Sequence, residues 1–158
     1  VAQQAVGIDS SRDMLAIARV NLDAANVRNA QVRHGEIYAL PFPDGFADFV
    51  TIHQVLHFLE DPVRALTEAA RILEPGGRLL IVDFAPHTHE FLREAHQHRR
   101  LGFADAEIIP WLEAAGLRLR PIVMTSVSAA CGSPASSRHR AATSDVQKWS
   151  SRRERRSL

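Results

Sequence analysis

The sequence predicts an α/β domain in which helices cover both faces of a mostly parallel β-sheet, giving three layers. The first observation is the stretch 62–73, whose apolar side chains recur at the period of a helix with one buried face. Pro75 and the Gly76-Gly77 pair then end this helix and turn the chain. The second observation is the run 79–82, which is apolar on both faces, as in a strand buried between layers of helices. Strand-like and helix-like segments alternate along the chain, which favours parallel strands joined by right-handed crossovers.

Length and composition indicate one ordinary globular domain. The chain has 158 residues, of which 46% are hydrophobic and 23% charged. Its single cysteine, Cys131, excludes an internal disulfide and fits a reducing compartment. Because the sequence contains no signal peptide and no apolar run of about 18 residues, we expect a cytoplasmic protein without membrane contact.

The elements of the first half are expected as follows. A strand ends at Asp9, and Ser10-Ser11 offers the N-cap of a helix that runs to about Ala25. Further strands are expected at 30–34 and 48–52, separated by a loop rich in proline and glycine. A short helical piece at 54–59 then leads to the helix that begins at Pro62.

Two more helices are expected at 89–100 and 104–115, and Pro110 either kinks or restarts the second. Gly116 ends that helix, and 117–127 predicts a last strand, so residues 1–127 form the predicted domain. Residues 129–158 carry seven Lys or Arg and two Asp or Glu, among many Ser and Ala. Such a segment buries too little apolar surface to offset its ordering entropy, so 128–158 is predicted to be a disordered, basic Ser/Arg-rich tail.

Polar residues follow each expected strand, at the edge of the sheet where ligands of open α/β domains bind. Asp9 ends the first strand, where a carboxylate would accept hydrogen bonds from the two hydroxyls of a ribose. Glu36 follows the second strand and could accept a hydrogen bond from an adenine amino group, while His53 and Asp83 follow the next two. Two acids after successive strands suit a nucleoside that lies across both strand ends. The alternative is that both acids only cap helices or turns.

Several linked motifs in residues 5–117 resemble class I S-adenosylmethionine (SAM)-dependent methyltransferases, which have a Rossmann-like fold. They are 6–11 (VGIDSS), 14–15, 35–45 (GEIYALPFPDG), 55–57, 61–62 and 68–77 (EAARILEPGG). The resemblance is greatest to the ubiquinone/menaquinone-type branch. Within that branch, 53–57, 83–87 and 98–103 resemble the methyltransferase half of ArsR-type regulator fusions, which carry a winged-helix DNA-binding domain ahead of it.

The resemblance implies SAM as cofactor and methyl transfer to a small-molecule acceptor. Asp9 would hold the ribose hydroxyls of SAM, and Ser10 and Met14 would border the ribose and adenine. Glu36 would face the adenine amine between Gly35 and Ile37, and the backbone of His53 would lie near the methionine end. No catalytic residue is assigned, because methyl transfer needs mainly proximity and in-line alignment.

The family's first strand and its glycine-rich loop have no counterpart here, because the chain begins at the second strand of the pattern. In the family that strand lies at the centre of the sheet, and its loop cradles the methionine moiety. We therefore expect a fragment with impaired cofactor binding, whose neighbouring strands lack their partner. Two alternatives stay open: a regulator whose methyltransferase-like half binds an effector or dimerises, with DNA as partner only if a winged helix precedes it, and a degenerate fragment without activity.

Histidines are frequent in the second half. His87, His89, His96 and His98 form two His-x-His pairs, but residues two apart do not share a helix face, so a metal site is not expected. His57 follows His53 by four residues, and if both lay on one helix face His57 could act as a general base near the methyl-transfer site. A surface histidine without a role is the alternative.

Overall fold

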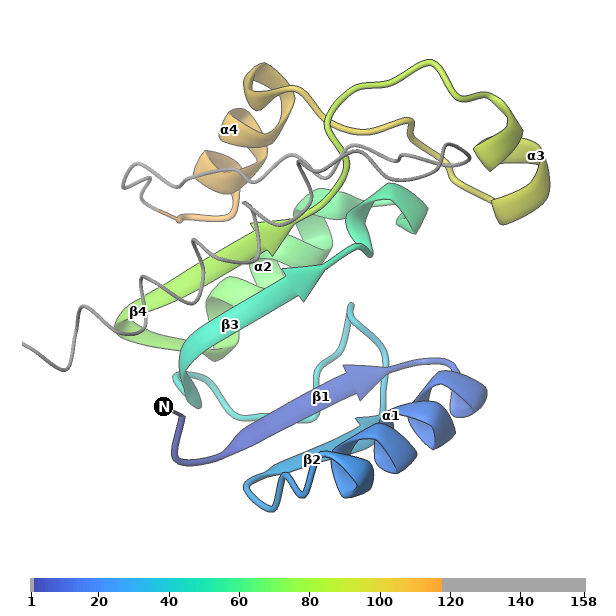
Figure 1. Cartoon of the computed structure of the whole chain (residues 1–158). Coiled ribbons are helices and arrows are strands. Elements are labelled where there is room, and N and C mark those ends of the chain that lie inside the picture. The colour runs from blue at the N-terminus through green and yellow to red at the C-terminus, as the bar shows by residue number, and fades with distance from the viewer. Residues whose placement is uncertain (1, 118–158) are drawn as a thin grey trace, which may run out of the picture. The chain divides into compact units, whose positions relative to one another are not determined.

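Four strands in two parallel pairs, together with helices, make up residues 2–117, the part of the chain that the computed structural model describes (Figure 1). The elements are β1 (Ala5–Asp9), α1 (Arg12–Ala24), β2 (Ala30–His34), β3 (Ala47–His53), the 3₁₀-helix η1 (Leu56–Phe58), α2 (Pro62–Ile72), β4 (Leu73–Val82), α3 (Phe91–His96) and α4 (Asp105–Ala114). This order confirms the predicted α/β class. The strand predicted at 117–127 and the tail predicted at 128–158 lie outside the described residues, apart from Leu117.

The strands form two parallel pairs. β1 pairs with β2 from Ala5↔Ala30 to Asp9↔His34, and β3 pairs with β4 up to His53↔Val82. Within the described residues, β1 and β3 are not hydrogen-bonded to each other, so each keeps one free edge. The parallel direction agrees with the prediction, and the described strands form two separate two-stranded sheets.

α1 begins at a side-chain cap and packs against β1 and β2. The Ser11 hydroxyl accepts a hydrogen bond from the Met14 amide (3.3 Å). Asp13 lies in the first turn, where its negative charge interacts favourably with the helix dipole. The helix ends at Ala24, with Ala25 as its C-cap, close to the predicted end. Leu15 is its one fully buried residue.

α2 starts with two sequence signals, an Asp61 carboxylate that caps the Arg64 amide (3.0 Å) and Pro62 at the first helical position. It ends at Ile72, three residues before Pro75, because Leu73 is already extended and belongs to β4. The Pro75-Gly76-Gly77 turn is therefore a feature within β4 rather than a connection before it. Gly76 has a φ of 89°, which requires glycine-like freedom.

The core lies between the β3–β4 sheet and the helices α2 and α4. It is built from Ile52, Leu56, Leu66, Ala69, Ile81, Phe103, Ile108 and Leu112. Each large aliphatic side chain in such a core contributes about 1.5–3 kcal/mol by leaving water. This layer fixes the carboxyl ends of β3 and β4.

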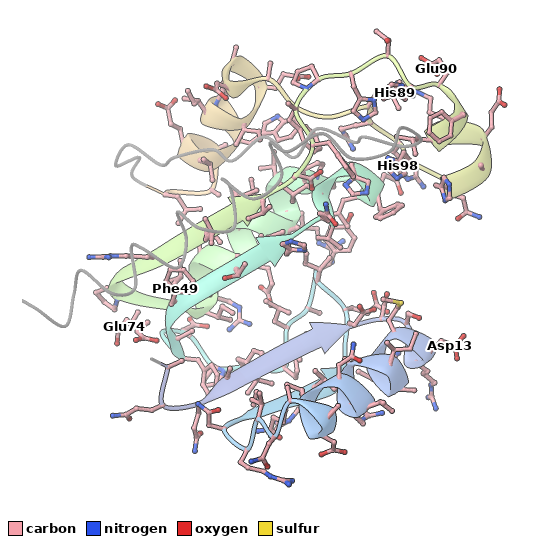
Figure 2. The ribbon with its side chains drawn as sticks, in the orientation of Figure 1. Asp13, Phe49, Glu74, His89, Glu90 and His98 are labelled. Carbon is pink, nitrogen blue, oxygen red and sulfur yellow. The ribbon has the colours of Figure 1, made fainter. Side chains whose placement is uncertain are left out.

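Within the described residues, the two faces of the β3–β4 sheet are covered unequally. Ile52 is 5% exposed on the face covered by α2, whereas Phe49, on the opposite face of β3, is 49% exposed (Figure 2). Strand side chains alternate between faces, so Thr51 and His53 share the exposed face with Phe49. In the run 79–82, Ile81 is buried in the core, and the other three residues are partly buried.

The predicted helix at 89–100 is much shorter in the structure. α3 ends at His96, because Gln97 takes a left-handed conformation (φ 56°) and the chain continues without regular structure. α4 agrees with the prediction at both ends: Pro110 lies inside it, and Gly116 (φ 74°) follows it. The amides of Gly116 and Leu117 donate to the carbonyls of Glu113 and Leu112, which is a Schellman ending.

Among residues 2–117, none of the helices is long and apolar enough to cross a membrane.

Candidate functional site

Six of the seven predicted site residues lie near one edge of the β1–β2 sheet. Because Asp9 is in register with His34, the residues that follow the two strands meet. The Gly35 amide donates to the Asp9 carbonyl (3.2 Å), which joins the two strand ends directly. Ser10, Glu36 and Ile37 continue from these ends, and Met14 lies in the first turn of α1 with 54% of its surface exposed.

The Asp9 carboxylate has the capping role that the sequence left open as an alternative, and it uses only one oxygen for it. Its Oδ1 accepts a hydrogen bond from the Ser11 amide (2.7 Å), so Asp9 does cap the turn that leads into α1. Ser11, and not Ser10, is the N-cap of the helix. Within the described residues Oδ2 has no hydrogen-bond partner, and the side chain is exposed. One carboxylate oxygen is thus held by the fold while the other is open to a ligand.

Gly35 allows the loop to lie close against β1. A Cβ atom at this position would be 3.0 Å from Ile8 Cγ2, closer than ordinary van der Waals contact. The chain then makes a tight turn, in which the Ala39 amide donates to the Glu36 carbonyl (3.1 Å). The Glu36 side chain remains exposed at the same edge as Asp9.

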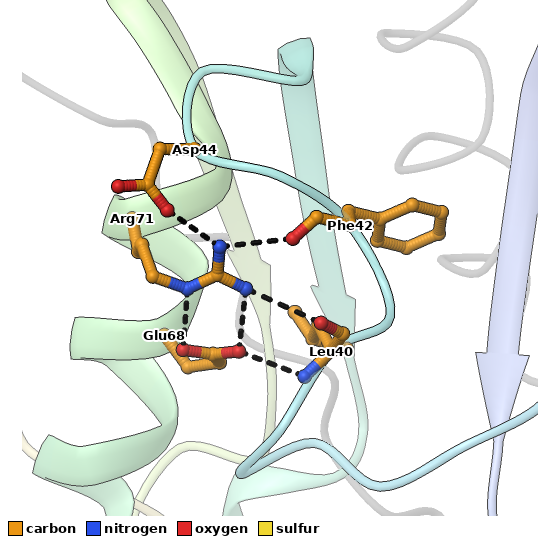
Figure 3. Close-up of polar contacts among 5 residues, drawn as sticks. All are labelled: Leu40, Phe42, Asp44, Glu68 and Arg71. Carbon is orange, nitrogen blue, oxygen red and sulfur yellow. Dashed lines mark hydrogen bonds and ion pairs between the residues drawn. The ribbon is translucent and has the colours of Figure 1, made fainter.

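The loop that carries these residues is fastened to α2 by Arg71 (Figure 3). Its guanidinium makes a bidentate pair with Glu68 (2.9 and 2.8 Å) and donates to the Asp44 carboxylate (2.7 Å). It also donates to the carbonyls of Phe42 (2.9 Å) and Leu40 (3.2 Å). Glu68 in turn accepts a hydrogen bond from the Leu40 amide (2.8 Å). The hydrogen bond from Arg71 is the largest cause that lowers the pKa of Glu68, and the two carboxylates raise the pKa of Arg71.

His53 lies in the other sheet, and the structure records no contact that joins it to Asp9 or Glu36. It is the last residue of β3 and is exposed. The next residue, Gln54, has a φ of 50° and donates from its amide to the Val82 carbonyl (2.7 Å), which ends the β3–β4 ladder. His53 is therefore on a strand, and the expectation that it shares a helix face with His57 is wrong.

His57 and Asp83 form a buried pair that the sequence did not reveal. His57 Nδ1 lies 2.7 Å from Asp83 Oδ1, and His57 is only 2% exposed. The other hydrogen bonds to this carboxylate come from the amides of Leu56 (3.0 Å) and Phe84 (2.8 Å). A carboxylate with three donors fixes the Nδ1–H tautomer of the histidine. The available signal was an acid at the end of a buried strand together with a histidine just after the neighbouring strand, but their pairing depends on the register of β3 with β4.

The remaining histidines do not form a metal centre in the described part of the chain, where no group of three or more His, Cys, Asp or Glu side chains is arranged to hold an ion. His98 is 8% exposed while His96 is exposed; His98 lies beyond the end of α3, so the two histidines do not share a helix as the prediction assumed.

Comparison with known families matches residues 1–81 of the 158 to the family described as "Methyltransferase domain". The chain belongs to this methyltransferase-domain family. It is 39% identical over 77 residues to demethylmenaquinone methyltransferase of Listeria welshimeri, which covers 49% of this chain and 33% of that protein. It is 34% identical over 85 residues to the uncharacterized methyltransferase YcgJ of Bacillus subtilis, covering 53% of this chain and 34% of YcgJ.

Solved structures give the same result for the fold. The crystal structure of YcgJ matches with a TM-score of 0.62 and 29% identity, over 72% of this chain and 52% of that one. A SAM-dependent methyltransferase from Aquifex aeolicus matches with a TM-score of 0.64 and 25% identity, over 76% of this chain and 62% of that one. The predicted Rossmann-like fold and the resemblance to SAM-dependent methyltransferases are confirmed. Nothing in these comparisons supports the narrower likeness to ArsR-type fusions. The chain spans about a third of the length of the curated relatives it matches.

Proposed function

We propose that this methyltransferase domain transfers a methyl group from SAM to a small-molecule acceptor, with the nucleoside of SAM bound at the exposed edge of the β1–β2 sheet. The observation that carries the proposal is the edge itself. The register of β1 with β2 brings Asp9 and Glu36 to neighbouring strand ends, and the Gly35 amide joins them. Family membership supports SAM as the methyl donor.

Each residue of the edge has a chemical role in this proposal. The Ser11 amide orients the Asp9 carboxylate through Oδ1, so Oδ2 can accept a hydrogen bond from a ribose hydroxyl without rearrangement. Glu36 accepts from the adenine amine, and the partly buried Ile37 and exposed Met14 give apolar contact to the adenine ring. Because hydrogen bonds to charged groups contribute about 1.5–3 kcal/mol, loss of the Asp9 carboxylate would weaken binding at least tenfold.

The methyl-transfer side is assigned to the carboxyl ends of β3 and β4, where the backbone of His53 would lie near the methionine end of SAM. The acceptor is a small organic molecule in this proposal, as in the demethylmenaquinone methyltransferases among the relatives. The reaction takes place in the cytoplasm, where the single cysteine of the chain stays reduced. A catalytic base is not part of the proposal.

The nucleoside edge is tested with S-adenosylhomocysteine by saturation-transfer NMR on residues 1–158, a method suited to weak binding. We expect the ribose and adenine protons to receive saturation more strongly than the homocysteine protons, because the proposed contacts are all to the nucleoside. Asp9→Ala should abolish the ribose signal or weaken it at least tenfold in a titration.

Asp13→Ala is the matched control. Asp13 is an exposed acid one turn further along, and Figure 2 shows it pointing outward from α1. This variant removes the same charge and should leave the NMR signals unchanged. If folded wild-type protein shows no saturation, or if Asp9→Ala and Asp13→Ala bind equally, the assignment of the edge is wrong.

A further inference from the structure

A cluster of rings lies where β3 and β4 end. We call His57, Phe58, Phe84, His87 and His98 the histidine cluster. The ring centroid of His98 is 4.2 Å from that of His57 and 5.6 Å from that of Phe84, and His87 is 5.8 Å from Phe84. His57 follows β3 and Phe84 follows β4, so the cluster packs residues 86–103, which include α3, against the carboxyl ends of this sheet.

The far end of this segment is tied to η1 by its backbone. The amides of Arg99 and Arg100 both donate to the His57 carbonyl (3.0 and 3.2 Å). The Arg100 guanidinium donates to the carbonyls of Leu59 and Glu60. These contacts place the His98 ring against His57 whenever the segment is closed.

The two ends of the segment are also joined to each other and to β4. The His87 amide donates to the Leu101 carbonyl (3.0 Å), and the Phe103 amide donates to the Phe84 carbonyl (2.9 Å). Between these bonds the segment has few buried residues of its own. Leu92, His98 and Phe103 are the buried ones, so a buried histidine carries a large share of the packing.

We propose that His87 and His98 are a pH-sensitive latch: with both imidazoles neutral the segment 86–103 is closed on the carboxyl ends of β3 and β4, and protonation of these histidines opens it. The motivating observation is that His98 Nδ1 and His87 Nε2 are buried and have no hydrogen-bond partner among residues 2–117. A proton on either ring would place a charge in the packed cluster without a partner.

The groups that face His98 do not compensate such a charge. They are His57 of η1, His96 of α3, His87 and the Asp83 carboxylate. Only Asp83 is acidic, and its oxygens are already engaged by His57 and the amides of Leu56 and Phe84. Burial is the largest cause that lowers the pKa of His98, followed by the neighbouring histidines.

A charge on His87 would likewise lack a free acidic partner. It is faced by His89, His57 and Glu90, and burial is again the largest cause that lowers its pKa. Glu90 is the acidic neighbour, and it pairs with Arg93 (3.2 Å). The other charged side chains of the segment are Glu94, Arg99 and Arg100.

The direction of the pH effect follows from these shifts. In the open segment both histidines titrate near the ordinary value of 6.5, whereas in the closed one their pKa values are lower. The closed state is therefore fully stable above about pH 6.5 and is lost as the pH falls below it. Each histidine changes the opening equilibrium by up to about tenfold per pH unit in that window.

The consequence for catalysis rests on the proposed function. His53 ends β3, and the latch packs against the carboxyl ends of β3 and β4, so opening would change the surroundings of the side assigned to methyl transfer. The latch itself involves no cofactor, so it can be confirmed or contradicted independently of the proposed function.

The test is amide hydrogen exchange by NMR on residues 1–158 without ligand, between about pH 5 and 7.5, with protection factors corrected for the intrinsic pH dependence of exchange. We expect protection of the Arg99, Arg100 and Phe103 amides to fall below about pH 6.5, by up to tenfold per unit for each histidine. The Gly35 amide, at the β1–β2 edge, should keep its protection. Constant protection at Arg99 and Arg100, or an equal loss at Gly35, would overturn the latch.

His98→Phe keeps a ring in the cluster and removes one of the two titrating groups, so the pH dependence of amide protection should fall to that of one histidine. The exposed His96→Gln is the control and should retain the wild-type pH dependence. If circular dichroism shows that His98→Phe is unfolded, His87→Phe takes its place and should reduce the pH dependence to that of one histidine. A folded His98→Phe variant that keeps the full wild-type pH dependence contradicts the proposal.

Discussion

Gly102 has a φ of 82° and lies directly against the backbone that leaves β4. A Cβ atom on it would be 2.1 Å from the Ala85 carbonyl oxygen and 2.8 Å from that of Phe84. The absence of a side chain therefore lets the segment 86–103 close, because the hydrogen bonds on either side of Gly102 need this approach. The sequence shows a glycine in this place, but not the strand end that it touches.

Gly102→Ala should be strongly destabilising, since the new methyl group meets backbone atoms that cannot rotate away. We expect a loss of about 2–4 kcal/mol in the free energy of unfolding, from strain at positive φ together with overpacking. Denaturant unfolding followed by circular dichroism measures it.

Gly76→Ala is the matched control for that substitution. Gly76 has a similar φ of 89°, but nothing lies within 4 Å of its added Cβ, so the control reports the cost of the φ angle alone, about 1–2 kcal/mol. Equal losses in the two variants would show that the contact with Ala85 does not matter.

At the scale of elements, Arg71 joins α2 to the loop that follows β2. One guanidinium contacts the Glu68 and Asp44 carboxylates and two carbonyl groups (Figure 3). Only a planar, forked donor can reach all of these at once. The loop begins at the proposed nucleoside edge, so α2 of the second sheet supports the site on the first.

Arg71→Lys should loosen this loop while leaving α2 intact, because the ammonium keeps the charge but loses the bidentate geometry. We expect the Leu40 amide, which donates to Glu68, to exchange faster with solvent. Arg19→Lys, on the surface of α1, serves as control and should leave the exchange of Leu40 unchanged.

The same clamp has a defined response to pH. Because the pKa of Glu68 is lowered in the folded state, its contribution is complete above the ordinary value of 4.5 and is lost as the pH falls through the lowered pKa. Protection of the Leu40 amide should accordingly persist at pH 5, where the histidine latch is already opening. If protection of the Leu40 amide and protection of the Arg99 and Arg100 amides were lost over the same pH range, the clamp and the latch would not respond to pH separately.

For the whole molecule, the two faces of the β3–β4 sheet differ in what covers them. The face with Ile52 and Ile81 packs on α2 in the core, and the face with Phe49 is exposed in the described residues. The apolar side chains on the two faces of this sheet therefore contribute unequally to the stability of the fold. Among residues 2–117, β1 and β3 each also have one edge without a hydrogen-bonded strand, so the strands form two separate sheets.

Ile52→Ala and Phe49→Ala test this asymmetry. Ile52→Ala should lower the free energy of unfolding by about 2–5 kcal/mol, because it leaves a cavity in the core. Phe49→Ala removes a larger side chain from an exposed position and should change it by less than about 1 kcal/mol. Guanidinium unfolding of both variants measures the difference, and a larger loss for Phe49→Ala would mean that this face is covered.

The sequence by itself determined the order of strands and helices, their parallel direction, and the strand-end positions of Asp9, Glu36 and His53. These depend on local signals: apolar period, capping residues such as Ser11 and Asp61, and breakers such as Gly116. It also carried the family motifs, which the comparisons confirmed. The capping of the turn before α1 by Asp9 was one of the alternatives that the sequence left open.

Tertiary structure alone decided what pairs across the chain. His57 and Asp83 are 26 residues apart, and they meet only because β3 and β4 are in register. The burial of His98 and the early end of α3 likewise depend on the backbone bonds to η1, which override the helical tendency of 89–100. Local patterns predict elements because they reflect short-range energetics, whereas partners, burial and unpaired polar atoms depend on contacts between residues that the sequence keeps apart.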